Sequence, residues 1–184
     1  MTVCILGIDP GLANTGIAVL AAPASRSKML RHLDTVTTKP PVRRRRLRQA
    51  DSDADRLGFI LAGIAQAIDD YDPVLVVYEA PTGGRSARGV KSLAYVVGGL
   101  VALCGERQVP CLSVTPAEAK RALTGSPTAS KADMIIAAKD VAPSRRWAKL
   151  RKGQLDHAAD AVAVATIGLR SEIVRAVLRL KASS

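Results

Sequence analysis

The sequence predicts an α/β fold in which helices flank a mixed sheet. Short apolar, β-rich runs come first along the chain, and helical and strand patterns then alternate towards the C-terminus. This order is typical of layered folds that place a sheet between helices. Hydrophobic residues make up 48% of the 184 residues, which suffices for one well-packed core, so we expect a single domain over residues 1–184.

Three strands are expected near the N-terminus. Residues 3–8 form an apolar run that ends at the turn-forming Asp9-Pro10-Gly11. A second apolar run covers residues 16–21, so the residues between the two runs predict a hairpin connection. A third strand is expected near residues 31–37.

Residues 39–55 predict an exposed, flexible basic loop. The segment holds two prolines, then five arginines, then three aspartates, and it is not apolar enough to fold alone. The apolar residues that follow recur at the spacing of one helix face, and this helix is expected to end at Asp72-Pro73. They are Leu57, Ile60, Leu61, Ile64 and Ile68.

The second half of the chain predicts two more strands and five helices. Residues 74–78 are a continuous apolar run, typical of a strand buried on both faces, and they lead directly into Glu79. Thr115 with Glu118 predicts a capping box. Two basic loops are expected at 82–89 and 143–153, the last strand at 110–114, and helices at 92–104, 116–123, 130–138, 155–169 and about 172–180.

The charge balance favours a polyanionic partner. Lysine and arginine total 27 against 16 acidic residues, for a net charge of +11. A merely solvated basic surface would give the same balance, so charge alone does not decide for nucleic acid.

Cysteine usage and the N-terminal residues predict a cytoplasmic protein without a membrane partner. Cys4, Cys104 and Cys111 lie in apolar stretches with no zinc-binding spacing, which predicts buried thiols in a reducing compartment. The first residues lack the basic start and long apolar run of a signal peptide. The longest apolar stretch, residues 93–104, is too short to cross a bilayer.

Three acidic residues occupy positions where an acid is costly. Asp9 and Glu79 each follow an apolar strand, and Asp160 lies in the otherwise apolar segment 158–164. A buried carboxylate needs a cation or a hydrogen-bond donor, and Mg²⁺ and Mn²⁺ prefer carboxylate oxygens. The three together predict a shared metal site, although each acid alone also fits a structural role in a turn or salt bridge.

Two further side chains share a helix face with Asp160. His157 precedes it by three residues and Asp156 by four, and both spacings bring side chains together on a helix. The pattern leaves open which of the two completes the site, since an acid at a helix start is also favoured by the helix dipole. A core-facing stripe is expected on this helix at Leu155, Ala159, Val162, Thr166 and Leu169.

Four motifs in order resemble the RuvC family of Holliday-junction resolvases. Together they extend over nearly the whole chain, from Met1 to about Arg170. They are GIDPG at 7–11 with Thr15-Gly16, VYEAP at 77–81, VTPAEAKRALTG at 114–125 with Ala129-Ser130-Lys131, and HAADAVAVA at 157–165.

The resemblance implies an RNase H-like nuclease domain, with a five-stranded mixed sheet flanked by helices. It further implies a homodimer that makes paired nicks in four-way DNA junctions during recombination and repair. The implied cofactor is Mg²⁺, two ions per active site, with Mn²⁺ as a substitute. A branch-migration motor is a possible partner.

The resemblance also assigns roles to residues. It selects His157 over Asp156, so the implied catalytic and metal-binding set is Asp9, Glu79, His157 and Asp160, with Asp156 as a possible partner of His157. Lys120 and Lys131 match lysines that bind the scissile phosphate. By charge and position, further DNA contacts are expected from Arg85, Arg88, Lys91, the arginines of 43–48 and Arg145-Arg146-Trp147.

One segment departs from the family pattern. Well-known members carry a base-stacking aromatic residue soon after the catalytic glutamate, whereas this chain has Thr82-Gly83-Gly84-Arg85 and no aromatic before Tyr95. Two rival functions therefore stay open: a nuclease for other branched DNA or RNA, and a junction-binding protein without cleavage. An actin-like ATPase is disfavoured because we find no further phosphate or adenosine loops. The apolar helix at 92–104, with Gly98-Gly99, fits either a dimer interface or the core.

Overall fold

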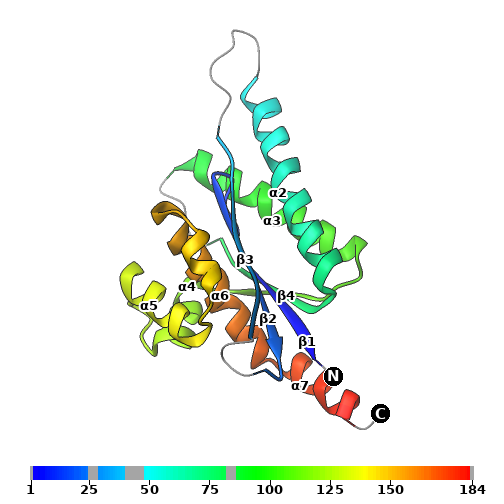
Figure 1. Ribbon diagram of the computed structural model, residues 1–184. Helices are drawn as coiled ribbons and strands as arrows, with labels where there is room; N and C mark the ends of the chain where they lie inside the picture. The colour runs from blue at the N-terminus through cyan, green and yellow to red at the C-terminus, as the bar shows by residue number, and fades with distance from the viewer. Residues whose placement is uncertain (1, 25–28, 40–47, 82–85, 183–184) are drawn as a thin grey trace.

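A five-stranded sheet forms the centre of the computed structural model, which describes residues 2–24, 29–39, 48–81 and 86–182 (Figure 1). Its order is β3-β2-β1-β4-β5. β1, β2 and β3 pair antiparallel, whereas β1, β4 and β5 pair parallel, so the predicted mixed sheet is confirmed. The strands are β1 (Val3–Asp9), β2 (Asn14–Ala22), β3 (Leu30–Thr37), β4 (Pro73–Glu79) and β5 (Cys111–Val114).

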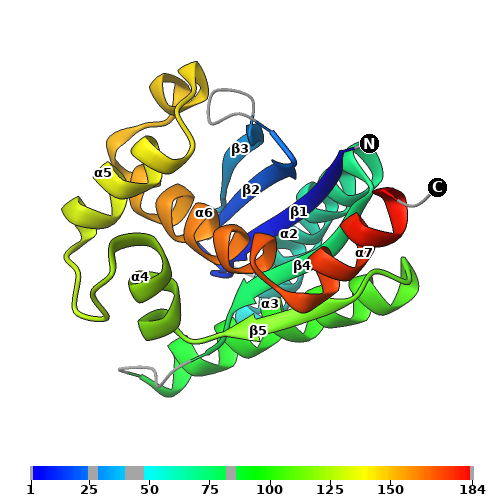
Figure 2. The ribbon, with the colours of Figure 1, turned by 90° about the horizontal axis from the view of Figure 1, so that it is seen from below.

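Helices cover both faces of this sheet. α2 (Gln49–Tyr71) and α3 (Ala87–Glu106) lie on one face, and α6 (Leu155–Leu169) crosses the other (Figures 1 and 2). Outside α6 pack α4 (Pro116–Thr124) and α5 (Lys131–Val141), while α7 (Glu172–Ala182) lies against β4. The short 3₁₀ helices η1 (Arg145–Lys149) and η2 (Lys152–Gln154) lead into α6.

The alternation of strand side chains decides which residues face α6. Ile5 belongs to the hydrophobic cluster beneath α6, whereas Leu6 and Ile8 belong to the cluster beneath α2 and α3. Because successive strand residues point to opposite faces, Asp9 follows Ile5 and Gly7 onto the α6 side.

Two glycines let α6 approach the sheet closely. A Cβ atom at Gly16 would lie 2.0 Å from the carbonyl oxygen of His157, and one at Gly7 would lie 2.2 Å from that of Ala161. The facing surface of α6 is itself built largely of alanine, so backbone packs against backbone. This contact brings the first turns of α6 to the ends of β1 and β2.

The predicted loop at 39–55 is corrected over its last part. Residues 40–47, which include most of the arginine run, lie outside the described residues, but α2 already begins at Gln49. Acidic residues are stabilised in the first turn of a helix by its dipole, and Asp53 accepts hydrogen bonds from Gln49 Nε2 (2.8 Å) and Arg56 Nη1 (3.3 Å). The polar residues from Gln49 onwards, which suggested a loop, therefore form the N-terminal turns of α2.

The apolar helix α3 is longer than expected. It starts at Ala87, where Ser86 caps it by accepting a hydrogen bond from the Gly89 N–H, and it has 20 residues. By length and composition alone it would be able to cross a membrane, which overturns the expectation of an apolar segment too short for this. Mostly buried core helices pass the same test, but only 17% of this apolar stretch of α3 is buried, with Val96 and Leu100 among its buried residues.

Three smaller expectations are also corrected. Cys104 is buried as predicted, but Cys4 is half-buried and Cys111 is exposed on the edge strand β5; all three are free thiols. The segment 143–153 contains η1 and η2 where a loop was expected. In α6 every residue from Ala158 to Thr166 except Asp160 is buried, because the helix lies between the sheet and α4 and α5, so it has no single core-facing stripe.

Candidate active site

The four residues expected to bind metal lie together at one end of the sheet. Asp9 ends β1, Glu79 ends β4, and His157 and Asp160 project from the first turns of α6. Val77 belongs to the cluster beneath α6, so strand alternation directs Glu79, two residues on, to the same side. Helix and strand ends thus place four ionisable side chains on one face.

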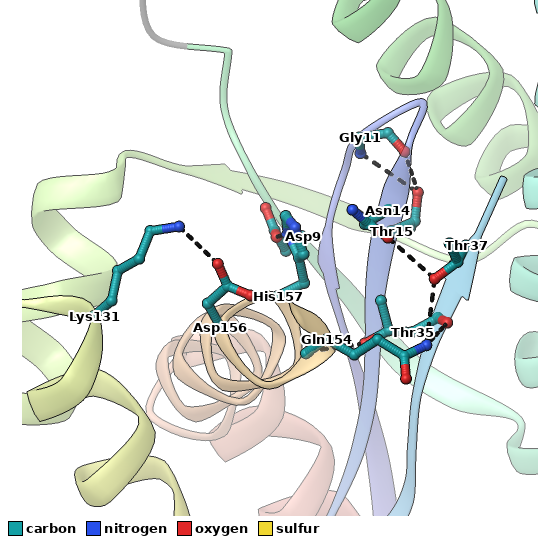
Figure 3. Close-up of polar contacts among 10 residues, drawn as sticks. All are labelled: Asp9, Gly11, Asn14, Thr15, Thr35, Thr37, Lys131, Gln154, Asp156 and His157. Carbon is teal, nitrogen blue, oxygen red and sulfur yellow. Dashed lines mark hydrogen bonds and ion pairs between the residues drawn. The ribbon is translucent and has the colours of Figure 1, made fainter. Parts of the chain in front are cut away.

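A hydrogen bond joins Asp9 to His157. His157 Nδ1 lies 2.6 Å from Asp9 Oδ2, and the side chains are 30% and 13% exposed (Figure 3). Burial raises the pKa of Asp9, and the bond with His157 opposes this rise. The same bond raises the pKa of His157 despite burial. When Asp9 is ionised, Nδ1 donates to the carboxylate, and in the neutral ring Nε2 is then the nitrogen that remains for an ion or a water molecule.

Glu79 and Asp160 lie in the same electrostatic environment. Burial, followed by the charges of Asp9 and Asp160, raises the pKa of Glu79 from its ordinary 4.5 to about 8. Burial and the charge of Asp9 raise the pKa of Asp160 from 3.8 to about 7. The acids therefore repel one another when all are ionised, and His157 partly offsets this for both.

This donor set fits a hard divalent cation. Among the residues that the structure describes, no three Asp, Glu, His or Cys side chains are already arranged around one metal position. The donors are nevertheless mainly carboxylate oxygens, partly buried, and their repulsion is the kind that a bound Mg²⁺ or Mn²⁺ removes. Closing around an ion requires Asp9 to share or exchange its bond with His157.

Both predicted phosphate-binding lysines lie near this cluster. The Lys120 charge opposes the rise in the pKa of Glu79, and the Lys131 charge does the same for Asp9 and Asp160. The two ammonium groups therefore sit on α4 and α5 within electrostatic reach of the acids, where a phosphate next to bound metal would meet them.

Asp156 does not make the contact expected of it. Its Oδ2 lies 2.6 Å from Lys131 Nζ, so the carboxylate pairs with α5 and not with the ring of His157 (Figure 3). Burial would raise the pKa of Asp156, but the hydrogen bond from Lys131 and nearby charges lower it overall.

A groove of about 610 Å³ opens beside His157. Its walls are the β1–β2 turn at residues 10–14 and the starts of α2 and α3, and Arg88 lines it. Lys91, by contrast, lies over the ring of Tyr95, with Nζ 5.5 Å from the ring centre. Arg85 lies outside the described residues. Of the three basic residues expected after Glu79, the structure therefore places Arg88 in the groove.

The basic segment at 145–147 divides into two parts. Arg145 and Arg146 are exposed, whereas Trp147 is buried and donates from Nε1 to the carbonyl oxygen of Ala142 at 3.0 Å. The tryptophan therefore belongs to the core, and the two arginines remain as candidates for DNA contact.

Two positioning residues were missed at the sequence level. Gln154 Nε2 donates to the Thr35 carbonyl oxygen at 3.1 Å, and Thr35 Oγ1 donates to the Gln154 carbonyl oxygen at 3.1 Å, which anchors the start of α6 to β3 (Figure 3). Arg56 Nη2 donates to the Leu12 carbonyl oxygen at 3.0 Å and so holds the β1–β2 turn beside the groove. Their partners are far away in sequence, so no local motif marks either residue.

Comparisons with known proteins agree on one family. The family model described as crossover junction endodeoxyribonuclease RuvC matches residues 5–167. The RuvC of Streptomyces avermitilis is 32% identical over 131 residues, covering 71% of this chain and 69% of that protein. The RuvC of Corynebacterium efficiens is 29% identical over 133 residues, and the match covers 72% of this chain but only 55% of that relative's length.

Solved structures show the same fold. Thermus thermophilus RuvC, in complex with a Holliday junction substrate, superposes with a TM-score of 0.72 at 24% identity, covering 89% of this chain and 91% of that one. The yeast mitochondrial Holliday junction resolvase Ydc2 gives a TM-score of 0.62 at 15% identity, covering 88% of this chain and 75% of that one. The RNase H-like fold is therefore confirmed, and because the family model spans most of the chain, this protein belongs to the RuvC family of crossover junction endodeoxyribonucleases.

Proposed function

We propose that this chain is a metal-dependent endonuclease that resolves four-way DNA junctions by paired symmetric nicks in recombination and repair. The observation that carries the proposal is the convergence of Asp9, Glu79, His157 and Asp160 where β1, β4 and the start of α6 meet. The Thermus thermophilus relative was solved with a Holliday junction substrate, which supports the same substrate for this chain.

Asp9, Glu79, His157 and Asp160 would hold two Mg²⁺ ions, with Mn²⁺ as a substitute. When bound, such ions supply an activated water and stabilise the leaving 3′ oxygen. The water oxygen forms a bond to phosphorus as the bond to the 3′ oxygen breaks, leaving a 5′ phosphate and a 3′ hydroxyl. The chain's own part is to fix the carboxylates on rigid strand and helix ends.

Basic residues around the acids would bind the DNA backbone. Lys120 and Lys131 are assigned to the scissile phosphate, where their charges offset the negative charge that develops in the transition state. Arg88, in the groove beside His157, and the exposed Arg145 extend the basic surface on either side. The net charge of +11 supports binding to a polyanion of this size.

Paired nicks require two active sites, and α3 supplies a surface for a second copy of the chain. Val90, Tyr95 and Val101 are 46%, 43% and 41% exposed on α3, and a Cβ atom built at Gly98 would meet nothing within 4 Å. Exposed apolar residues on an apolar helix fit a symmetric interface across a two-fold axis. We therefore propose a homodimer that forms through α3. We further propose that each copy is a single nuclease domain and that the protein is cytoplasmic.

The test is nicking of synthetic DNA by wild type and Asp9→Asn. A four-way junction, a fork and an RNA duplex of matched sequence are incubated with Mg²⁺, Mn²⁺ or Ca²⁺. We expect wild type to nick the junction preferentially with Mg²⁺ or Mn²⁺ and Asp9→Asn to be inactive but still bound. Equal cutting of the other substrates would contradict junction resolution, tight binding without any nicking would favour a binding protein, and nicking by Asp9→Asn would contradict the site.

A further inference from the structure

The ion pair between Lys131 and Asp156 links α5 to α6 at the edge of the acid cluster. Lys131 is the first residue of α5 and Asp156 lies in the first turn of α6, and their charged atoms are 2.6 Å apart. The Lys131 side chain is 80% exposed, whereas that of Asp156 is 21% exposed. One partner is therefore held by the protein, and the other is exposed to solvent at the edge of the cluster (Figure 3), within electrostatic reach of Asp9 and Asp160.

A structural salt bridge explains this arrangement poorly. Exposed ion pairs contribute only about 0–1 kcal/mol to stability. A lysine at the first position of a helix is also opposed by the helix dipole, which favours negative charge there. Lys131 therefore does not stand where helix stability would place it, whereas Asp156, in the first turn of α6, is favoured by the helix dipole.

The arrangement does explain how a flexible lysine is given a fixed position. A free lysine side chain loses about 2 kcal/mol of rotamer entropy when it is ordered. An ammonium group has three donors, so it can keep one bond to Asp156 and direct the others to phosphate oxygens. Asp156 is fixed by α6, the helix that also carries His157 and Asp160, so the lysine is held relative to those ligands.

We propose that Asp156 is a positioning residue, which holds the Lys131 ammonium group beside the carboxylate cluster so that it meets the scissile phosphate of the bound junction. This role rests on the proposed nuclease function. It goes beyond that function by assigning to Asp156 an action through Lys131, separate from metal binding and from any contact with DNA.

The decisive comparison is between turnover and binding. If Asp156 were only a negative charge near DNA, Asp156→Asn would bind the junction more tightly and cleave it at least as fast. Positioning predicts a single-turnover rate about tenfold lower, since misplacing a phosphate ligand should cost less than the 10²-fold or more of removing one. Junction affinity measured in EDTA should be unchanged or tighter.

A double-mutant cycle tests whether Asp156 acts through Lys131. We expect Lys131→Ala and the double variant to cleave at the same rate, because Asp156→Asn has nothing left to misplace. Asp156→Glu should recover part of the rate by restoring the pair. Asp70→Asn, at the far end of α2, makes the same charge change away from the site and should match wild type.

If the wild-type protein nicks junctions, three results for the variants would overturn the proposal. They are a wild-type rate for Asp156→Asn, a tenfold loss that persists in the Lys131→Ala background, and a raised Mg²⁺ requirement, which would mark Asp156 as a metal ligand. A wild type that cleaves no substrate refutes the proposed function itself, and the positioning role with it. Melting temperatures of all variants check that each one folds.

Discussion

The contact between Gly16 and α6 offers the sharpest test of how the site is built. A Cβ atom at Gly16 would lie 2.0 Å from the His157 carbonyl oxygen, whereas side-chain Cβ atoms essentially never approach another atom closer than 3.0 Å. The Gly16→Ala variant must therefore move α6 away from β2 by about 1 Å. Neither atom belongs to a flexible side chain, so the backbone itself has to shift.

The shift should affect catalysis more than folding. Overpacking of this kind costs about 1–3 kcal/mol, which a stable domain tolerates, but a 1 Å misplacement of catalytic groups can lower a rate by about 10²-fold. The shift would lengthen the 2.6 Å contact between His157 and Asp9 and carry Asp160 with it. We therefore expect a folded Gly16→Ala protein whose single-turnover nicking rate is about 10²-fold lower.

Single-turnover cleavage of a labelled junction and thermal denaturation measure the two effects. Gly153→Ala is the matched control, because Gly153 lies in η2, just before α6 in the sequence, and an added Cβ atom there would meet nothing within 4 Å. It should retain wild-type rate and stability. Wild-type cleavage by Gly16→Ala would refute the claim that close packing of α6 on β2 sets the geometry of the site.

Three further predictions follow from the charges and surfaces of the chain. Glu79 and Asp160, with pKa values of about 8 and 7, must lose protons to bind a cation, so the Mg²⁺ concentration for half-maximal cleavage should fall between pH 6 and pH 8.5; a constant value would contradict this. The pKa of Glu79 is about 8 in the folded state against 4.5 in the unfolded chain, so the metal-free fold loses stability progressively as pH rises from 4.5 to 8. In EDTA, the Glu79→Gln variant removes this loss, so its melting temperature should exceed that of wild type clearly at pH 8.5 and much less at pH 5.5. Val101→Asp on α3 should shift sedimentation towards monomer, whereas Ile136→Asp on α5, an exposed position on the opposite side of the sheet, should leave the oligomer intact.

The sequence predicts the strand ends of the site well. Asp9 and Glu79 each terminate an apolar run, and an acid in that place is costly enough to stand out without any structure. Strand alternation then directs both to the α6 side, because Gly7 and Val77, two residues earlier, face it. The cost of burying an acid and the two-residue alternation of strand side chains therefore suffice to predict where Asp9 and Glu79 point.

The helical part is harder to predict because tertiary packing overrides the local pattern. The spacing left His157 and Asp156 as equal candidates because both share a helix face with Asp160, and burial of nearly all of residues 158–166 means that the expected core-facing stripe does not orient the helix. Two tertiary contacts separate them: His157 hydrogen-bonds Asp9 at the end of β1, and Lys131 of α5 pairs with Asp156. The start of α2 was hidden for a different reason, since its first two turns are rich in polar residues that resemble a loop, with Asp51 in the first turn favoured by the helix dipole.

The histidine at position 157 is best understood from the charges around it. Burial raises the pKa of Asp9, Glu79 and Asp160, the Asp9 charge adds to the rise for the other two, and a fourth carboxylate would add to this repulsion before any cation binds. A histidine instead hydrogen-bonds Asp9, and the positive charge of its protonated form opposes the rise in the pKa of all three acids; loss of that proton then frees Nε2 for an ion. His157 thus lowers the electrostatic cost of the metal-free cluster and, once deprotonated, would still be able to bind an ion, which is a physical reason for a mixed donor set at the proposed metal site.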